Sequence, residues 1–226
     1  MRCFLSCLVF VIAELHGESS SVSFNTFTSC SHLSMAGAGY LYPSPTALKT
    51  NPSSFKKYRK FETSIIKYPS DIISQSVGYG SHWGKRYFSL AFRHISYGVF
   101  NGYDEDGTFT NTYNSSNTRV SGTYAGQLKK RPIYLGSKLS WVSSNLSNKS
   151  MNSLKLAIGN RFIFEEFQTS VGISFHEIDV FPDKNEKTYP MKLVLSSSKK
   201  LAYLPLTIYF DLLSSKDSKR DEYFLG

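Results

Sequence analysis

Cysteine is scarce in this sequence, which contains only Cys3, Cys7 and Cys30. The first two lie in an apolar N-terminal run, so a chain that loses this run keeps one cysteine and cannot form an internal disulfide. Long apolar runs are also missing. After residue 20, no stretch reaches the roughly 18 consecutive apolar residues of a membrane-spanning helix, and this excludes a helical membrane span.

Charge and catalytic motifs are equally sparse. Charged residues are 19% of the chain, and the 26 basic residues exceed the 17 acidic ones mainly as scattered positions. No nucleic-acid recognition motif accompanies this excess, so we expect no nucleic-acid partner. The histidines lack metal-ligand spacing, and no nucleophile elbow, phosphate-binding loop or dinucleotide fingerprint occurs. The sequence therefore predicts no enzyme, no cofactor and no metal site.

The N-terminus has the composition of an export signal. Met1-Arg2 precedes an apolar run from Cys3 to Ala13, which is too short to span a bilayer as a helix. We predict a signal peptide over residues 1–20. The alternative is a buried N-terminal strand or helix.

Alternation of apolar and polar residues recurs along the rest of the chain. The alternating segments are Ile73–Gly80, Phe88–Arg93, Arg119–Leu128, Ile133–Ser143, Ser153–Phe164, Phe167–Glu177, Met191–Ser198 and Leu201–Asp211. Period-two alternation places one set of side chains on each face of a strand. Gly, Pro and Asn clusters between the segments predict antiparallel hairpins, with turns over residues 81–85, 129–132, 145–152 and 182–185. We expect the longest connection, residues 98–118, to be an exposed loop.

Alternation alone also describes a soluble β-sandwich or a lipocalin-type barrel, whose apolar face points inward. Two features favour the membrane. The faces opposite the apolar ones are rich in Gly, Ser and isolated cations, and aromatic residues cluster near segment ends, as in interfacial girdles. The girdle candidates are Tyr68, Tyr79, Trp83, Tyr87, Tyr97, Tyr134 and Trp141, and the lipid-facing candidates include Leu154, Ile158, Val171, Ile173 and Phe175. We therefore predict an all-β fold, an antiparallel transmembrane β-barrel in the outer membrane, with its strands in residues 61–226 and a short loop or helical segment in residues 21–60.

Two stretches carry a family resemblance. Leu33–Gly39, followed by Pro45–Leu48 and Asn51-Pro52, resembles the N-terminal signature of the PorV/PorQ outer-membrane proteins, which are similar to the fatty-acid transporter FadL. Ser96–Gly107 resembles a segment that PorQ-like proteins carry after an early hairpin. The resemblance continues to about Leu206, and so covers most of the chain after the signal.

The resemblance implies a FadL-like barrel that acts as a non-enzymatic component of type IX protein secretion, with lipid and other secretion-system proteins as partners. The alternatives are a FadL-like transporter of hydrophobic small molecules and a secreted soluble β-sandwich binding domain. The sequence departs from the family pattern where Ser44, Thr46 and Lys49 replace acidic residues and Ser53 replaces alanine. Family members are longer and have more strands, so we expect a C-terminally truncated chain with a partial barrel.

The first candidate site is the family motif in the N-terminal segment, Gly37, Gly39, Asn51 and Pro52. Glycine permits positive φ and close backbone approach, and Asn-Pro favours an extended turn. We expect this segment to pack in or under the barrel. The alternative is an ordinary exposed loop.

The second set of family-motif positions is Gly98, Gly102, Tyr103, Asp104 and Gly107. The acidic run that begins at Asp104 lacks the ligand series of a calcium loop, and a solvated hairpin explains it better.

A third set consists of four cations on the expected lumen face: Arg93, Lys138, Lys155 and Arg161. They could line a route for anionic or amphipathic molecules. They could equally be paired with carboxylates or capped by the N-terminal segment, and we favour this structural role.

Overall fold

The structure is a computed structural model that describes residues 30–47, 49–55, 59–128, 131–146, 149–181, 191–215 and 222–225. The predicted signal peptide lies outside these residues. Ten strands form one antiparallel sheet in which each strand pairs with the next in the chain. The strands are β1 (Lys60–Lys67), β2 (Ile73–Trp83), β3 (Arg86–Tyr103), β4 (Phe109–Gln127), β5 (Ile133–Leu146), β6 (Lys149–Phe164), β7 (Thr169–Asp179), β8 (Lys192–Lys200), β9 (Thr207–Ser215) and β10 (Glu222–Leu225). The predicted all-β antiparallel fold is thus confirmed.

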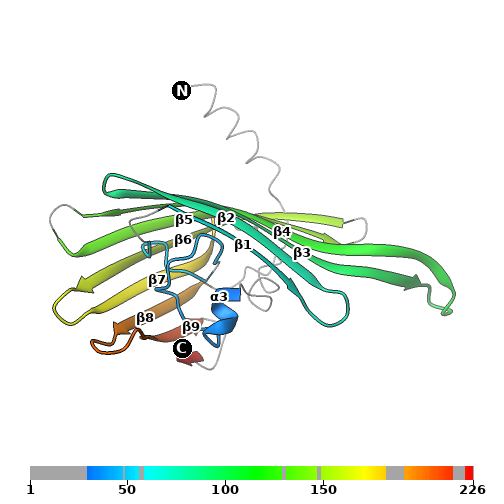
Figure 1. The fold of residues 1–226 in the computed structure, drawn as a ribbon. Coiled ribbons are helices and arrows are strands. Elements are labelled where there is room, and N and C mark those ends of the chain that lie inside the picture. The colour runs from blue at the N-terminus through cyan, green and yellow to red at the C-terminus, as the bar shows by residue number, and fades with distance from the viewer. Residues whose placement is uncertain are drawn as a thin grey trace, which may run out of the picture.

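The sheet curls around the described residues between Cys30 and Phe55, here called the N-terminal part (Figure 1). Figure 1 shows this part, in blue, lying below β1–β3 and beside β7–β9. Helix α3 (Cys30–Ser34) opens it, and no helix in the described part of the chain has the length and apolar character needed to cross a membrane. β1 and β10 stand at the two ends of the strand order, and the described residues show no ladder that joins them.

The two faces of the strands have opposite character. In β2, Ser74, Ser76 and Gly78 are buried, whereas Val77 and Tyr79 between them are exposed. This inverts the usual arrangement, in which apolar side chains are inside. The face toward the N-terminal part, the inner face, is therefore polar, and the outer face is apolar.

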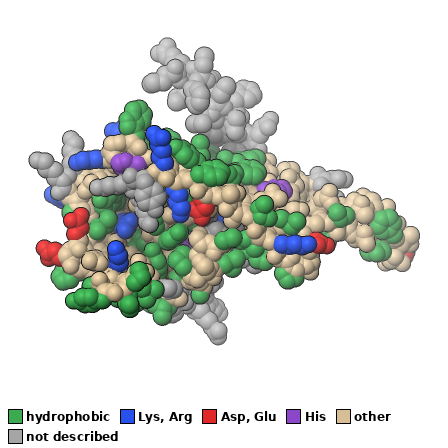
Figure 2. All heavy atoms as spheres, in the orientation of Figure 1, with side chains coloured by type: hydrophobic (Ala, Val, Ile, Leu, Met, Phe, Trp, Pro, Cys, Tyr) green, Lys and Arg blue, Asp and Glu red, His purple; other side chains and the backbone are tan. Residues whose placement is uncertain are grey.

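Strand register aligns the outer residues into rows. One row crosses six strands through Thr63, Val77, Phe92, Val120, Trp141 and Leu154. Outer side chains that are exposed by more than a third include Phe61, Ile65, Phe88, Leu90, Leu135, Leu139, Ile158, Val171, Ile173, Leu195 and Phe210. Figure 2 shows hydrophobic side chains spread over the surface from the curled sheet to the tip of the β3–β4 hairpin.

Among the residues that the structure describes, the buried apolar side chains form three small clusters instead of one continuous core. Tyr40 packs with Val194 and Leu213, and Phe55 packs with Tyr87 and Ala125. The third cluster consists of Ile95 and Val142. Two of the three thus contain a residue of the N-terminal segment, which supplies packing that the sheet alone lacks.

The loop predicted over residues 98–118 is wrong. β3 runs on to Tyr103 and β4 begins at Phe109, and the two form a hairpin that projects beyond the sheet (Figure 1). The pairing of β3 with β4 shifts register between Ser96 and Val99, where Gly98 has a φ of 83°. Beyond this bulge the two strands pair again, although their sequence there is polar.

Two further boundaries differ from the prediction. β5 and β6 extend to Leu146 and from Lys149, well into the turn expected over residues 145–152. β9 begins at Thr207 instead of Leu201. Local composition alone predicted these turns inaccurately. Cross-strand hydrogen bonds can extend a strand into Asn- and Ser-rich sequence, which composition assigns to a turn.

The predicted aromatic girdle is partly wrong. Tyr79 and Trp83 are 46% and 91% exposed, but Tyr87 is buried on the inner face and stacks on Phe55 at 5.1 Å between ring centroids. Tyr97 also lies inside, where its hydroxyl accepts a hydrogen bond from the buried Asn117. Aromatic content near strand ends therefore does not identify the face on which a ring lies.

Candidate functional site

Residues 38–55, here called the seated segment, lie against the inner face with most of their described side chains buried. Gly37 and Gly39 precede and open it with φ of 88° and 99°, a conformation that glycine adopts without strain. The backbone N–H of Asn51 donates to the carbonyl of Tyr40 at 2.7 Å, which closes the segment into a loop. It is therefore an ordered part of the interior and not an exposed loop.

Asn51 and Pro52 rest on glycines of the sheet. A Cβ at Gly136 would lie 2.4 Å from the backbone carbonyl of Pro52, and one at Gly159 would lie 2.2 Å from the side-chain oxygen of Asn51. A Cβ at Gly172 would lie 2.8 Å from the amide nitrogen of Asn51. These distances are too short for any side chain, so glycine at these positions creates the surface on which Asn-Pro sits.

The side chain of Asn51 is fully buried and makes hydrogen bonds at both ends. Its amide nitrogen donates to the carbonyl of Asn160 in β6 at 2.9 Å. Its oxygen accepts from the backbone N–H and the hydroxyl of Ser53, at 3.0 and 2.7 Å. A buried amide with satisfied donor and acceptor fixes both orientation and register.

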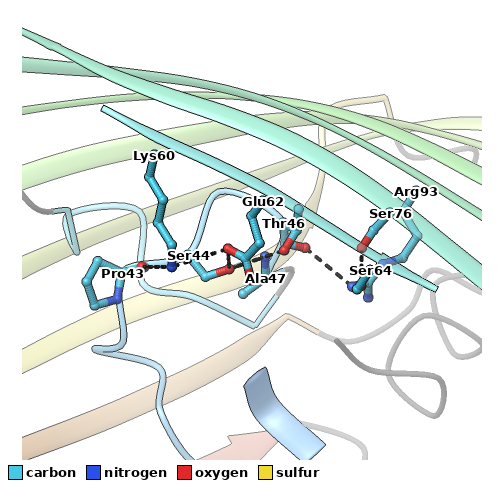
Figure 3. A network of polar contacts seen from close by, with 9 residues as sticks. All are labelled: Pro43, Ser44, Thr46, Ala47, Lys60, Glu62, Ser64, Ser76 and Arg93. Atoms are coloured by element: carbon cyan, nitrogen blue, oxygen red, sulfur yellow. Dashed lines mark hydrogen bonds and ion pairs between the residues drawn. The ribbon is translucent and has the colours of Figure 1, made fainter. Parts of the chain in front are cut away.

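Two cations of the inner face hold backbone carbonyls of the seated segment. Arg93 in β3 donates to the carbonyl of Thr46 at 3.4 Å (Figure 3), and Lys138 in β5 donates to the carbonyls of Ala47 and Thr50 at 3.2 and 3.3 Å. Arg93 and Lys138 are 2% and 5% exposed. Buried charge is costly unless it is hydrogen-bonded, so these contacts bind the segment and solvate the cations.

Two carboxylates, one near each end of the strand order, also hold the segment. Asp211 in β9, which is fully buried, accepts hydrogen bonds from the backbone N–H groups of Gly39 and Tyr40 at 2.6 and 3.2 Å. Glu62 in β1 accepts from the hydroxyl of Ser44 at 2.7 Å (Figure 3). The segment thus connects β1, β3 and β5 with β9 by polar contacts.

Two further inner cations are paired with carboxylates of β7. Arg119 donates to Glu177 at 3.1 Å, and Lys155 forms an ion pair with Asp179. Glu177 has a φ of 59°, and a register shift at this point places both His176 and Glu177 on the buried face. The bulge thereby aims the carboxylate at Arg119.

His32 in α3 joins this interior. Its ring lies edge-on to Tyr40 at 6.3 Å, and Tyr40 in turn meets His176 at 5.4 Å. Burial, followed by the positive charges of Lys49 and Arg93, lowers the pKa of His32 from 6.5 to about 3. The neutral imidazole is therefore the form that fits the packed interior.

A cavity of about 700 Å³ opens beside the seated segment, between it and the ends of β5–β9. It is lined by Leu41, Pro43, Phe55, Tyr134, Arg161, Ile163, Glu165, Gln168, Ser170, Ser198, Lys200, Thr207 and Tyr209. Arg161, the fourth predicted lumen cation, donates to the hydroxyl of Ser170 at 3.0 Å. The structure thus places Arg93, Lys138 and Lys155 in buried contacts and Arg161 in an open cavity.

The second family-motif set does not join this site. Gly98, Gly102 and Tyr103 belong to the projecting end of β3, and Asp104 begins the turn of the β3–β4 hairpin. The carboxylate of Asp104 accepts from the backbone N–H groups of Asp106 and Thr108, at 3.1 and 2.7 Å, and Gly107 has a φ of 78°. These residues shape an exposed turn.

Sequence reasoning missed several groups that complete the interior, among them Glu62, Arg119, Gly136, Glu177 and Asp211. The alternation of side chains along each strand already placed Arg119 and Gly136 on the polar face. This position could have identified both as interior residues. Glu177 gave no such signal, because the bulge reverses its parity. The residues that the structure describes contain no group of three or more His, Cys, Asp or Glu side chains arranged to hold a metal ion.

Comparison with family models, with curated proteins and with solved structures finds no match to this chain.

Proposed function

We propose that this protein is an outer-membrane β-barrel of the PorV/PorQ type, exported by its N-terminal signal and acting as a non-enzymatic component of type IX protein secretion. The observation that carries the membrane part is the inversion of the two faces, with a polar inner face and an apolar outer face. The secretion part rests on the sequence resemblance and on the burial of its motif residues Gly39, Asn51 and Pro52.

The outer face supports contact with lipid. Apolar surface in water costs roughly 25 cal/mol per Å², and soluble monomers rarely expose continuous apolar patches of more than a few hundred Å². Here apolar rows cross strand after strand, as in the row from Val77 through Phe92 to Val120. A bilayer removes this cost, and a closed barrel of alternating strands is one of the two structures that can span it.

The soluble alternatives explain the faces less well. A β-sandwich or a lipocalin-type barrel buries its apolar face and leaves the polar face in water. The described sheet does the reverse, since Ser89, Ser140 and Ser174 are buried while Leu90 and Leu139 are exposed. A hydrophobic uptake route is also less well supported, because the inner face is polar and the seated segment occupies it.

Membrane insertion carries one structural requirement. A free strand edge in the hydrocarbon leaves backbone groups without hydrogen-bond partners, which a bilayer does not tolerate. The outer edge of β1 must therefore be paired, either by β-strands of the same polypeptide or by those of another. The completed barrel is part of this proposal.

Fractionation of cells that express the protein tests the membrane assignment. We expect recovery in the outer membrane, and electrophoretic mobility that changes when the detergent-solubilised protein is boiled. A protein recovered in the soluble periplasmic or extracellular fraction, with unchanged mobility, would refute the barrel.

A deletion strain tests the role in secretion. We expect cargo proteins of the type IX system to accumulate inside the cell, with restoration by the intact gene. Normal cargo export in the deletion strain would refute this role and leave the membrane assignment standing.

A further inference from the structure

The cavity beside the seated segment is a second functional feature of this interior. One wall consists of Leu41, Pro43 and Phe55 from the segment, and the other is formed by residues near the ends of β5–β9. Its volume of about 700 Å³ lies within the range of roughly 300–1,000 Å³ that is typical of small-molecule sites. No side chain of the described residues fills this space, so a ligand of moderate size could enter it.

Aromatic rings supply three of the six apolar lining residues. Phe55, Tyr134 and Tyr209 all contribute to the wall, and Phe55 is held edge-to-face against Tyr134 at 5.5 Å. Phe55 also stacks on Tyr87 within 6° of parallel. These contacts fix the rings before any ligand arrives, and preorganised aromatic side chains bind with a small loss of conformational entropy.

Apart from Ile163, the remaining lining residues are polar, and the hydroxyl and amide groups among them both donate and accept hydrogen bonds. These residues are Arg161, Glu165, Gln168, Ser170, Ser198, Lys200 and Thr207. An acyl chain in this cavity would take water from these groups without replacing the hydrogen bonds, which is unfavourable. A polyhydroxylated ring compound would satisfy them and also present a C–H face to the aromatic rings.

Charge favours an acidic ligand. Arg161 and Lys200 oppose one carboxylate, Glu165, and the Nε of Arg161 has no hydrogen-bond partner in the described part of the chain although it is buried. Guanidinium binds carboxylate groups with two parallel hydrogen bonds, so Arg161 can anchor an acid within reach of the rings.

We propose that this cavity binds a short acidic oligosaccharide, with its sugar rings against Phe55, Tyr134 and Tyr209 and its carboxylate at Arg161. The proposal does not depend on the role in secretion, because it concerns only the inner side of the sheet.

The experiment uses the full chain purified in detergent and an array of short uronic-acid oligosaccharides, each paired with its uncharged methyl ester. We expect retention of at least one acidic glycan and binding of its ester that is weaker by about tenfold or more. Titration calorimetry with that glycan should show about a tenfold loss for Arg161→Gln, a smaller loss for Lys200→Gln, and no change for Arg86→Gln.

The three variants separate binding from folding. Lys200 and Arg86 are exposed, so their substitution leaves the fold intact even if Arg161→Gln disturbs it. Arg86 lies at the start of β3 and outside the cavity lining, which makes it a matched control for loss of a cation. Three results would each overturn the proposal. The first is an array on which no acidic glycan is retained, and the second is equal affinity of wild type, Lys200→Gln and Arg161→Gln for the retained glycan. The third is binding of dodecanoate when no glycan binds.

Discussion

The inner and outer faces of the same strands are packed in different ways. On the inner face, Arg93 and Lys138 are almost fully buried and bind backbone carbonyls of the seated segment. On the outer face, Leu90 and Leu139 are exposed and lie in rows set only by strand register. Inside, specific polar contacts and small apolar clusters replace one continuous apolar core, whereas the apolar surface outside has no partner among the described residues. The difference supports the proposal that the outer face contacts lipid.

The largest expected effect concerns a buried inner pair. Glu177→Gln leaves Arg119 buried without its counter-charge, and we expect a loss of about 3–5 kcal/mol in the free energy of unfolding. Urea unfolding followed by tryptophan fluorescence, in detergent or lipid vesicles, measures this. The exposed Glu165→Gln should change the free energy by less than about 0.5 kcal/mol. Equal effects of the two substitutions would contradict a specific polar interior.

An outer-face substitution gives the next effect. Ile173→Arg should destabilise the protein in lipid vesicles by about 2–4 kcal/mol, because it places a charge on the side that we propose faces lipid. Ile173→Leu is the control and should be close to neutral. The same urea titration decides the outcome. Unchanged or increased stability of Ile173→Arg would indicate that this face contacts water.

Glycine substitutions compare the faces with the smallest possible change. Gly136→Ala places a methyl group against the backbone of Pro52, and we expect a loss of about 1–3 kcal/mol together with faster proteolysis of the seated segment. Gly122→Ala is the matched control, because its Cβ would meet only Leu90 at an ordinary 3.7 Å. Identical protease sensitivity of the two variants would mean that Asn51-Pro52 does not rest on the sheet.

The sequence predicts interactions between residues that are close along the chain better than interactions between residues that are far apart along it. Period-two alternation predicted the strands and placed Ser140 and Leu139 on opposite faces, because parity is a local property. It could not predict that Asp211 accepts from Gly39, which precedes it by 172 residues. Nor could it predict Glu177, since a single bulge reverses the parity on which the method depends.

The candidate site was predictable to the same degree. The glycines and Asn51-Pro52 could be singled out as a motif, since their conformational preferences are intrinsic. The position of Asn51-Pro52 on Gly136 and Gly159 depends on how the sheet curls. The alternation pattern of the strands does not predict this curvature. Arg93 and Arg161 looked equivalent in sequence, yet one binds the seated segment and the other lines a cavity.

The smallest expected effect concerns pH and the attachment of α3. The pKa of His32 is lowered from 6.5 to about 3 in the folded state, so the unfolded state binds more protons between these values. The stability of this attachment is complete above pH 6.5 and falls as the pH decreases, by at most about 1.4 kcal/mol per pH unit. The protection factors of residues 30–40, which correct exchange rates for their intrinsic pH dependence, should therefore decrease between pH 7 and pH 5.

His32→Phe provides the control for this prediction. The variant keeps a buried ring but removes the titration, so its exchange rates, corrected for intrinsic pH dependence, should change little over the same range. Acceleration of the same size in the variant would assign the effect to another group.

The most direct test of the central claim uses the two tryptophans of the chain, Trp83 and Trp141. Trp83→Phe leaves only Trp141, which lies in an outer row between Val120 and Leu154. The protein is reconstituted into vesicles whose acyl chains carry bromine, a contact quencher of indole fluorescence. Strong quenching, compared with unbrominated vesicles, is the result expected if the outer face contacts lipid. Unchanged fluorescence in the brominated vesicles would contradict it.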